Sequence, residues 1–146
     1  MSADKFVYVT YIASTPAKVW KALTEGELTR QYWKHTNESD WRPGSKWKHV
    51  ADDGQGTVRL VGQVVEVIPN RRLVLTWGDA DTSETADCSR VAIEIETVGN
   101  MVRLTVTHDE LKPGSEMSRS ISEGWPRVLS SLKSFLETGR PLDTWA

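Results

Sequence analysis

The sequence predicts an α+β protein in which an antiparallel sheet and a long C-terminal helix share one core. Apolar residues recur with a period of two through most of the stretch from residue 45 to residue 108. They recur with a helical period from residue 121 to residue 136. Strands that form one block, with helices before and after it, are typical of α+β proteins with antiparallel sheets.

The N-terminal segment predicts one strand and two short helices. Residues 6–13 carry β-branched and aromatic side chains on both faces, so we expect a strand that is covered on both sides. Thr15 can cap the helix that follows, and Pro16 fits its first position, where a missing N–H costs nothing. A second short helix is expected over residues 27–34.

Turn residues divide the middle of the chain into five further strands, which makes about six strands in all. We expect them at residues 45–51, 57–68, 71–77, 91–96 and 102–108. The last two alternate most regularly between apolar and polar residues, which indicates one buried face and one exposed face. The predicted order is therefore a strand, two short helices, a meander of strands and a long helix.

The C-terminal segment predicts a long helix that Gly139 can end in the left-handed conformation. Its first part contains Gly124, Trp125 and Pro126, which suit a helix poorly. Pro126 has no N–H to donate to the carbonyl of residue 122, and its ring crowds that carbonyl. We therefore expect the helix to kink or to begin at Pro126. Gly124 would let a bound molecule approach closely, so we expect this tripeptide at the mouth of a cavity.

Composition excludes several classes of protein. A chain of 146 residues has about the length of one domain, so we expect a single domain over residues 1–146. Charges of both signs are mixed and sum to −2, which predicts no surface for nucleic acid. No apolar stretch is long enough for a membrane helix, and the N-terminus lacks the pattern of a signal peptide. With Cys88 as the only cysteine, these features predict a cytoplasmic protein without a membrane partner.

Neither a metal nor another cofactor is predicted. The three histidines, His35, His49 and His108, lack the spacing of metal ligands, and Cys88 has no second cysteine. Four acids crowd one polar loop, at positions 79, 81, 84 and 87. Their spacing does not fit a calcium-binding loop, so we expect this loop to be solvated.

His108 is the strongest candidate for a functional polar residue. Alternation places it on the same face as Leu104 and Val106, so its side chain should point inward. Two roles are open: a hydrogen bond that closes the core, or a polar anchor or general acid–base in a pocket. Glu66 and Arg90 are weaker candidates, since a solvated sheet face explains both. Convergent titratable groups are scarce, so the sequence favours binding over catalysis and predicts no catalytic residue.

Tryptophan is unusually frequent in this chain. The seven tryptophans stand at positions 20, 33, 41, 47, 77, 125 and 145. They can build a solid core, or they can line a cavity for an apolar ligand, because pockets are largely apolar with a few polar anchors. The candidates for the lining of such a cavity are Trp47, Trp77, His108, Ile121 and Trp125.

Five segments, in this order along the chain, carry a family resemblance: YIASTPAKVWKALTEGE, GSKW, GQVVEVIPNRRLVLTW, RLTVTHDEL and GWPRVLSSLKSFLETG. They resemble the activator of Hsp90 ATPase homologue 1-like family, part of the START-like, Bet v 1-like helix-grip superfamily. The resemblance spans about residues 5–139. It implies a curved antiparallel sheet that grips the long C-terminal helix, with a cavity between them. It implies function less closely, because one fold hosts many activities.

The first function hypothesis is a soluble binding protein that holds a small, largely apolar molecule between the sheet and the C-terminal helix. The resemblance also implies a co-chaperone-like or stress-response module that binds other proteins. A third hypothesis is a cyclase-like or hydrolase-like enzyme that uses the same cavity. The expected partner is therefore a small apolar ligand, while a homodimer and a chaperone partner stay open.

Overall fold

The computed structural model describes residues 4–80 and 88–143, which form a seven-stranded antiparallel sheet and three helices. The strands are β1 (Asp4–Ile12), β2 (His35–Ser39), β3 (Lys46–Ala51), β4 (Val58–Ile68), β5 (Arg72–Asp79), β6 (Ser89–Val98) and β7 (Met101–Leu111). The helices are α1 (Pro16–Thr24), α2 (Gly26–Trp33) and α3 (Glu116–Thr138). The strand order in the sheet is β1-β7-β6-β5-β4-β3-β2.

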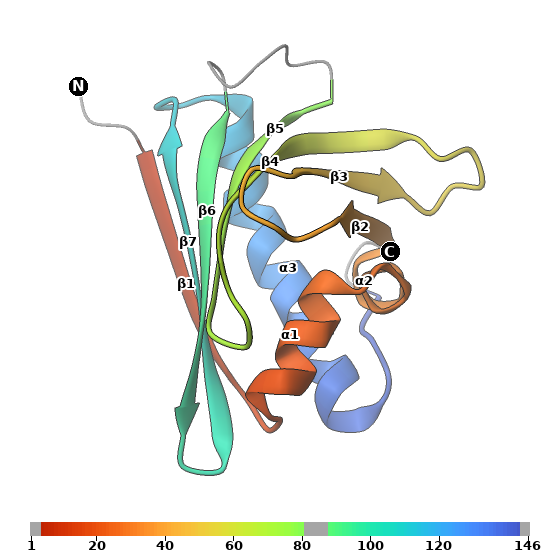
Figure 1. The fold of residues 1–146 in the computed structure, drawn as a ribbon, viewed down its shortest axis with the longest axis vertical. Coiled ribbons are helices and arrows are strands. Elements are labelled where there is room, and N and C mark those ends of the chain that lie inside the picture. The colour runs from red at the N-terminus through yellow and green to blue at the C-terminus, as the bar shows by residue number, and fades with distance from the viewer. Residues whose placement is uncertain (1–3, 81–87, 144–146) are drawn as a thin grey trace.

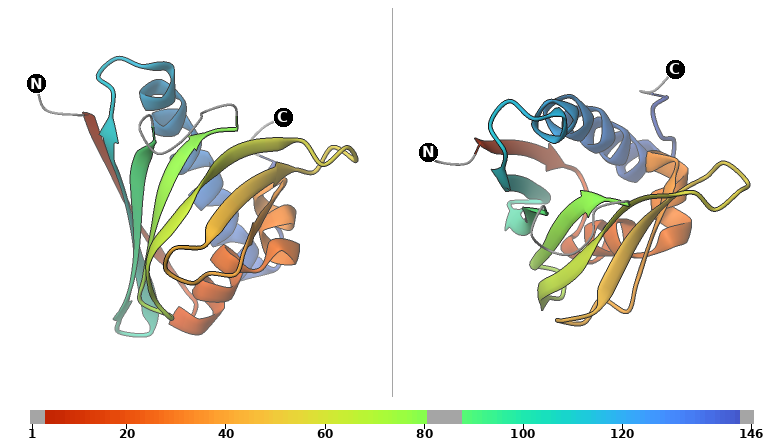
Figure 2. Two further views of the ribbon diagram at one scale, coloured as in Figure 1. Left: turned by 45° about the horizontal axis from the view of Figure 1, so that its top comes forward. Right: turned by 90° about the horizontal axis from the view of Figure 1, so that it is seen from above.

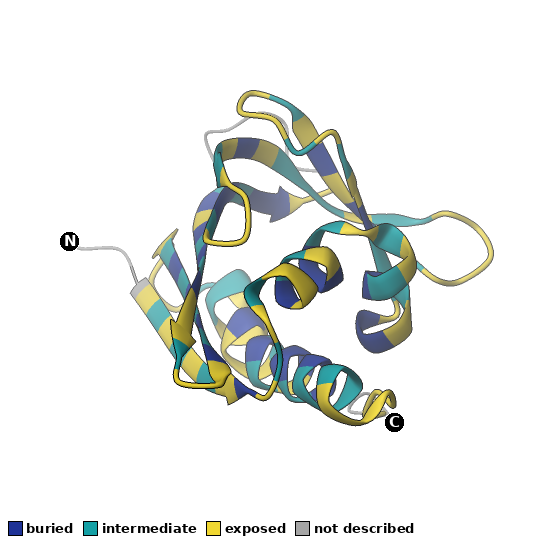
Figure 3. Ribbon diagram, turned by 60° about the horizontal axis from the view of Figure 1, so that its bottom comes forward, coloured by how far each residue is buried: buried dark blue, intermediate teal, exposed yellow. Residues whose placement is uncertain are grey.

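This architecture confirms the predicted fold class, a curved antiparallel sheet around a long C-terminal helix (Figure 1). The two short helices after the first strand are also confirmed. The sheet bends so that β1 lies beside α3 at one end and β2 lies against α2 at the other (Figure 2). The buried parts of the sheet and of the helices face the space between these layers (Figure 3).

The strand count of about six is corrected to seven by β2, an edge strand that the sequence did not indicate. Its residues, HTNES, show no alternation of apolar side chains, and only Asn37 is buried. Backbone pairing with β3, from His35 opposite Ala51 to Ser39 opposite Trp47, defines the strand instead. An edge strand can form in this way because ladder hydrogen bonds do not depend on the side chains.

The helix ends follow the predicted capping chemistry. The Thr15 hydroxyl accepts a hydrogen bond from the backbone N–H of Lys18 at 3.3 Å, and Pro16 is the first residue of α1. At the other end of the chain, Gly139 closes α3 in the left-handed conformation, with φ of 81°. Both predictions are confirmed.

Of the two alternatives expected at Pro126, a kink or the start of the long helix, the second is wrong. Helix α3 begins at Glu116, where the Ser115 hydroxyl caps it by accepting from the N–H of Ser118, and Pro126 lies inside the helix. A proline deprives one carbonyl, that of Ser122, of its helical donor. Ser122 is exposed, so solvent can satisfy this carbonyl, and the packing of Trp125 on the other face of the helix outweighs the local cost.

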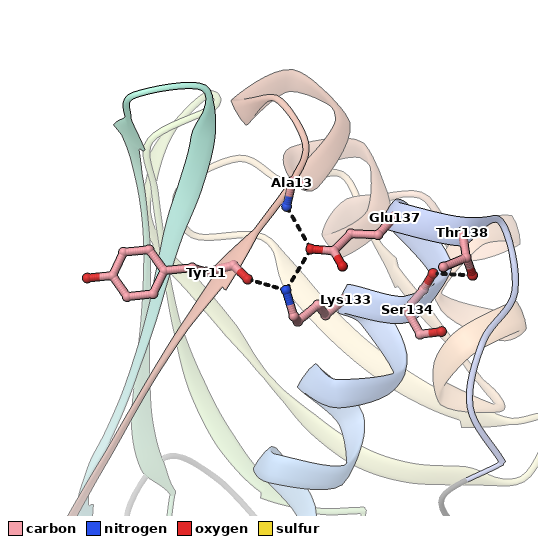
Figure 4. Close-up of polar contacts among 6 residues, drawn as sticks. All are labelled: Tyr11, Ala13, Lys133, Ser134, Glu137 and Thr138. Atoms are coloured by element: carbon pink, nitrogen blue, oxygen red, sulfur yellow. Dashed lines mark hydrogen bonds and ion pairs between the residues drawn. The ribbon is translucent and has the colours of Figure 1, made fainter.

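Strand β1 is an edge strand with one open face, so the expectation that both of its faces are covered is wrong. Val7, Val9 and Tyr11 are 51%, 46% and 43% exposed. The free edge is bonded to α3 near its C-terminal end, where the Lys133 ammonium donates to the Tyr11 carbonyl at 2.6 Å (Figure 4). Glu137, paired with Lys133, accepts from the backbone N–H of Ala13 at 2.8 Å. These bonds block part of an edge that could otherwise pair with another strand.

The apolar stripe of α3 packs into the core, and Leu132 lies at its centre with no exposed surface. Replacing Leu132 with alanine is expected to lower the free energy of unfolding by about 2–5 kcal/mol, because buried methyl groups are lost and a cavity remains. Chemical denaturation of both proteins measures this difference. Leu142→Ala is the control, since Leu142 is 46% exposed, and it should change stability by less than about 0.5 kcal/mol. An equally small effect at Leu132 would contradict the packing of α3 against the sheet.

Candidate functional site

A hollow of about 250 Å³ lies between the first half of α3 and the concave face of the sheet. Strands β3, β4 and β5 and the end of α2 complete its wall. Most of the wall is apolar, and its large apolar side chains are those of Trp33, Leu60, Trp77, Met117, Ile121, Trp125 and Val128. A cavity of about 150 Å³ is enough to hold benzene, so this hollow has room for one or two rings. Several of its lining residues are exposed, so a further ring of a larger ligand can extend into solvent.

Three tryptophans from three different elements meet at the hollow. Trp33 ends α2, Trp77 lies on β5 and Trp125 lies on α3. Their ring centroids are 5.4 Å apart for Trp77 and Trp125, 5.5 Å for Trp33 and Trp125, and 6.4 Å for Trp33 and Trp77. The rings are tilted or offset against one another, as aromatic pairs prefer. The wall is therefore a contiguous indole surface.

The structure brings three of the five predicted lining residues to the hollow. Trp77, Ile121 and Trp125 line it, whereas Trp47 and His108 lie behind its wall, next to Trp77. Trp47 is 2% exposed, and its ring lies 5.1 Å from that of Trp77. His108 has no exposed surface. Both therefore support the wall from inside the core.

Gly62 allows Trp47 to take its position. The indole N–H of Trp47 donates to the carbonyl of Thr76 at 2.7 Å, across the strand that carries Gly62. A Cβ atom on Gly62 would lie 2.0 Å from the Thr76 carbonyl oxygen and 2.4 Å from Trp47 Nε1. Only glycine therefore fits at this position, since any side chain would occupy the place of the hydrogen bond.

His108 is the centre of a buried chain of hydrogen bonds that connects α3 to the sheet. The indole N–H of Trp125 donates to His108 Nδ1 at 3.1 Å, and His108 Nε2 lies 2.6 Å from Ser89 Oγ. Ser89 Oγ in turn lies 3.2 Å from the carbonyl of Trp77, to which it donates. Because an indole nitrogen is only a donor, Nδ1 must accept, and the imidazole proton is assigned to Nε2. Every member of the chain then has a partner.

This environment gives His108 a structural role. Burial lowers the pKa of His108 from 6.5 to about 4, so the imidazole is neutral at physiological pH. Its hydrogen-bond partners are Ser89 and Trp125, and no described carboxylate contacts it. A general acid–base works best with a pKa near the working pH and with access to the substrate. Of the two roles that the sequence left open, the geometry favours the hydrogen bond that closes the core.

His49 is a lining residue that the sequence analysis did not select. It is 3% exposed, and its Nδ1 lies 2.5 Å from Asn37 Oδ1, which is a hydrogen-bond acceptor. Its ring is stacked on that of His35 with centroids 4.2 Å apart. Burial, and secondarily the nearby His35, holds the pKa of His49 well below its usual value. The ring is therefore neutral, and with the proton on Nδ1 its Nε2 is an acceptor at the hollow.

Trp77 contributes a second polar atom to this region. Its Nε1 is buried and has no hydrogen-bond partner among the described residues. Buried indole N–H groups usually have a partner, and leaving one unpaired costs about 1–3 kcal/mol. Because this atom is itself buried, it lies within the wall and is not open to the hollow.

The remaining sequence candidates lie elsewhere. Glu66 pairs with Arg72 at 2.6 Å on a partly exposed part of the sheet, and Arg90 is exposed. Of the four crowded loop acids, only Asp79 belongs to the described residues, and it lies at the rim of the hollow. Within residues 4–80 and 88–143, histidine, cysteine and acidic side chains do not gather in threes as a metal site requires. None of the described helices has the length and apolar character of a membrane span.

The curved sheet, the gripped helix and the hollow between them define a START-like helix-grip protein. The chain belongs to the family described as activator of Hsp90 ATPase homolog 1-like protein, whose model matches residues 13–137. No match was found among curated proteins. The resemblance inferred from the five sequence segments is therefore confirmed.

Solved structures of similar proteins share the fold over nearly their whole length. The Aha1 dimer from Colwellia psychrerythraea is 24% identical, with a TM-score of 0.75 over 93% of this chain and 98% of that one. Protein MLL2253 from Mesorhizobium loti is 25% identical, with a TM-score of 0.77 over 91% and 96%. PFC0360w from Plasmodium falciparum, described as an HSP90 activator, is 21% identical, with a TM-score of 0.74 over 90% and 95%.

The two buried histidines predict a loss of stability in acid. His108 takes up a proton near pH 6.5 in the unfolded chain but only near pH 4 in the folded protein, so the free energy of unfolding falls as the pH drops through this window. His108 alone should remove about 2 kcal/mol between pH 7.5 and pH 5, and His49 should add to the loss in the same direction. Urea denaturation at both pH values measures the change. An NMR titration that showed His108 gaining a proton near pH 6.5 in the folded protein would contradict the assignment.

Proposed function

We propose that this protein binds a small, largely apolar molecule in the hollow between α3 and the sheet. The observation that carries the proposal is the contiguous wall of Trp33, Trp77 and Trp125 around about 250 Å³ of space. Protein cores are close-packed, and voids larger than a water molecule are few. A space of this size between α3 and the sheet is therefore better explained as a ligand site than as part of a packed core.

One buried polar side chain of the lining gives the hollow the means to orient a ligand. His49 lines the hollow, and with the proton on Nδ1 its Nε2 is an acceptor. Ligand sites are typically apolar, with a small number of polar groups that fix orientation. A ligand with one hydrogen-bond donor would match this acceptor.

The geometry supports binding more than catalysis. His108, which the sequence predicted as a lining residue, forms hydrogen bonds with Ser89 and Trp125 through its two ring nitrogens. The wall separates it from the hollow. The carboxylates that line the hollow, Asp79 and Glu116, belong to exposed residues at its rim. Ser120 carries the hydroxyl of the described lining, and no hydrogen bond joins it to His49 or to a carboxylate, as a nucleophile and its base require.

Filling the hollow tests the proposal. The neutral fluorescent probe N-phenyl-1-naphthylamine is expected to bind the wild-type protein with micromolar affinity, about −8 kcal/mol, as measured by fluorescence titration. Ile121 is a lining residue from α3, and Ile121→Trp should weaken binding at least tenfold while the protein stays folded, since the hollow has room for the larger ring.

Leu129→Trp is the matched control, because Leu129 is 1% exposed on the same helix but does not line the hollow. Overpacking at Leu129 should lower the free energy of unfolding by about 1–3 kcal/mol. If Ile121→Trp is destabilised as much as Leu129→Trp and the wild type does not bind the probe, the space is ordinary core and the proposal is wrong.

Self-association is a second candidate function, and the open face of β1 favours it. Val7, Val9 and Tyr11 place three large side chains in a row on an edge strand, and the Tyr11 ring points away from α3 (Figure 4). Exposed apolar patches at a sheet edge are typical of interaction sites. A second copy of this chain is the proposed occupant, and the relative from Colwellia psychrerythraea is itself described as a dimer.

A charge on this face should abolish a dimer. Val9→Lys is expected to convert a dimeric wild type to monomer, because burying an unpaired ammonium in the interface is costly. Sedimentation velocity across a range of concentrations measures the change. Val65→Lys is the control, since Val65 is also an exposed strand residue, 38% accessible, but lies on β4. A wild type that sediments as a monomer at all concentrations would rule out this second candidate.

A further inference from the structure

We infer that the hollow selects an organic cation, a molecule with an apolar body and a positively charged nitrogen. The inference rests on the proposed function and names the chemical class of its ligand. Three observations carry it: the charge of the rim, the aromatic character of the wall, and the neutral state of the histidine that lines the hollow.

Two carboxylates lie at the rim of the hollow. Asp79, at the end of β5, and Glu116, in the first turn of α3, both line it. The described lining contains no lysine or arginine, and no described residue forms an ion pair with either carboxylate. A groove of one charge sign concentrates ligands of the opposite sign and disfavours ligands of its own sign.

The wall below the rim suits a cation better than it suits an anion. Each indole presents a π-system whose face is electrostatically negative, and tryptophan binds cations more strongly than the other aromatic residues do. Three such rings, Trp33, Trp77 and Trp125, line one hollow. Aromatic walls combined with nearby carboxylates are a general solution for ammonium groups that are too apolar for an ordinary salt bridge.

His49 does not repel a cationic ligand. An imidazolium at this position would repel a cation, but the buried ring is neutral and offers its Nε2 as an acceptor. The N-terminus of α3, where the helix dipole is positive, is occupied by its own groups. The Ser115 hydroxyl bonds the N–H of Ser118, and Glu116 lies in the first turn. An anionic ligand would have to displace these groups.

A pair of isosteric probes separates charge from shape. Benzyltrimethylammonium and neopentylbenzene have the same skeleton and differ in one atom, a quaternary nitrogen in place of a quaternary carbon. Competition of each probe against N-phenyl-1-naphthylamine, at low ionic strength, gives the two affinities. The ammonium compound is expected to bind about tenfold more tightly, the effect of a partly desolvated cation on an aromatic wall with carboxylates nearby.

The charge-neutralising double variant Asp79→Asn/Glu116→Gln tests the rim directly. It should weaken benzyltrimethylammonium at least threefold and leave the affinity for neopentylbenzene unchanged, since only the first probe is charged. Glu123→Gln is the matched control, because Glu123 is an exposed carboxylate on the same helix that does not line the hollow. This control should leave both affinities unchanged.

The outcomes distinguish this inference from the proposed function. If N-phenyl-1-naphthylamine binds but the ammonium compound binds no more tightly than its carbon isostere, the hollow is a general apolar site and the inference is overturned. The same conclusion follows if Glu123→Gln weakens the cation as much as the double variant does. If no probe binds, both the proposed function and this inference are wrong.

Discussion

The hydrogen bond from Trp125 to His108 is the constraint on which the arrangement of the interior depends. It joins the middle of α3 to β7, and the hydrogen bonds continue through Ser89 on β6 to the backbone of β5. The direction of every proton in this chain follows from one fact, that an indole nitrogen can only donate. A shift of α3 along the sheet would leave two buried polar atoms unpaired, Trp125 Nε1 and His108 Nδ1, at about 1–3 kcal/mol each.

The hollow follows from where this bond lies. Beyond Val128, which also lines the hollow, residues such as Leu132 are buried between the helix and the sheet. On the N-terminal side of Trp125, Ile121 and Gly124 face the hollow, and Gly124 has no side chain to fill it. The same helix therefore seals the core with one half and leaves room with the other, while Pro126 lies at the boundary without ending the helix.

Periodicity and capping chemistry in the sequence predicted most of the fold, because both are local properties. The missed strand β2 is polar and is held by backbone pairing, so no side-chain pattern marks it. In the site, strand and helix periodicity predicted that Trp77, Ile121 and Trp125 line the hollow. Trp33 and His49 reach the hollow only because the sheet is curved, which periodicity does not show. His49 lies two residues from Trp47 on β3, which was the available signal. Alternation showed that His108 points inward, but it could not show that other rings separate it from the hollow.

The core and the wall of the hollow share one residue, Trp77, at the centre of this molecule. The ring of Trp77 contacts the rings of Trp33, Trp47, His49, His108 and Trp125. Its carbonyl accepts from Ser89, and its indole N–H is left unpaired beside the hollow. A substitution at Trp77 would therefore disturb the core and the proposed ligand site at once, and its effect on binding could not be separated from unfolding.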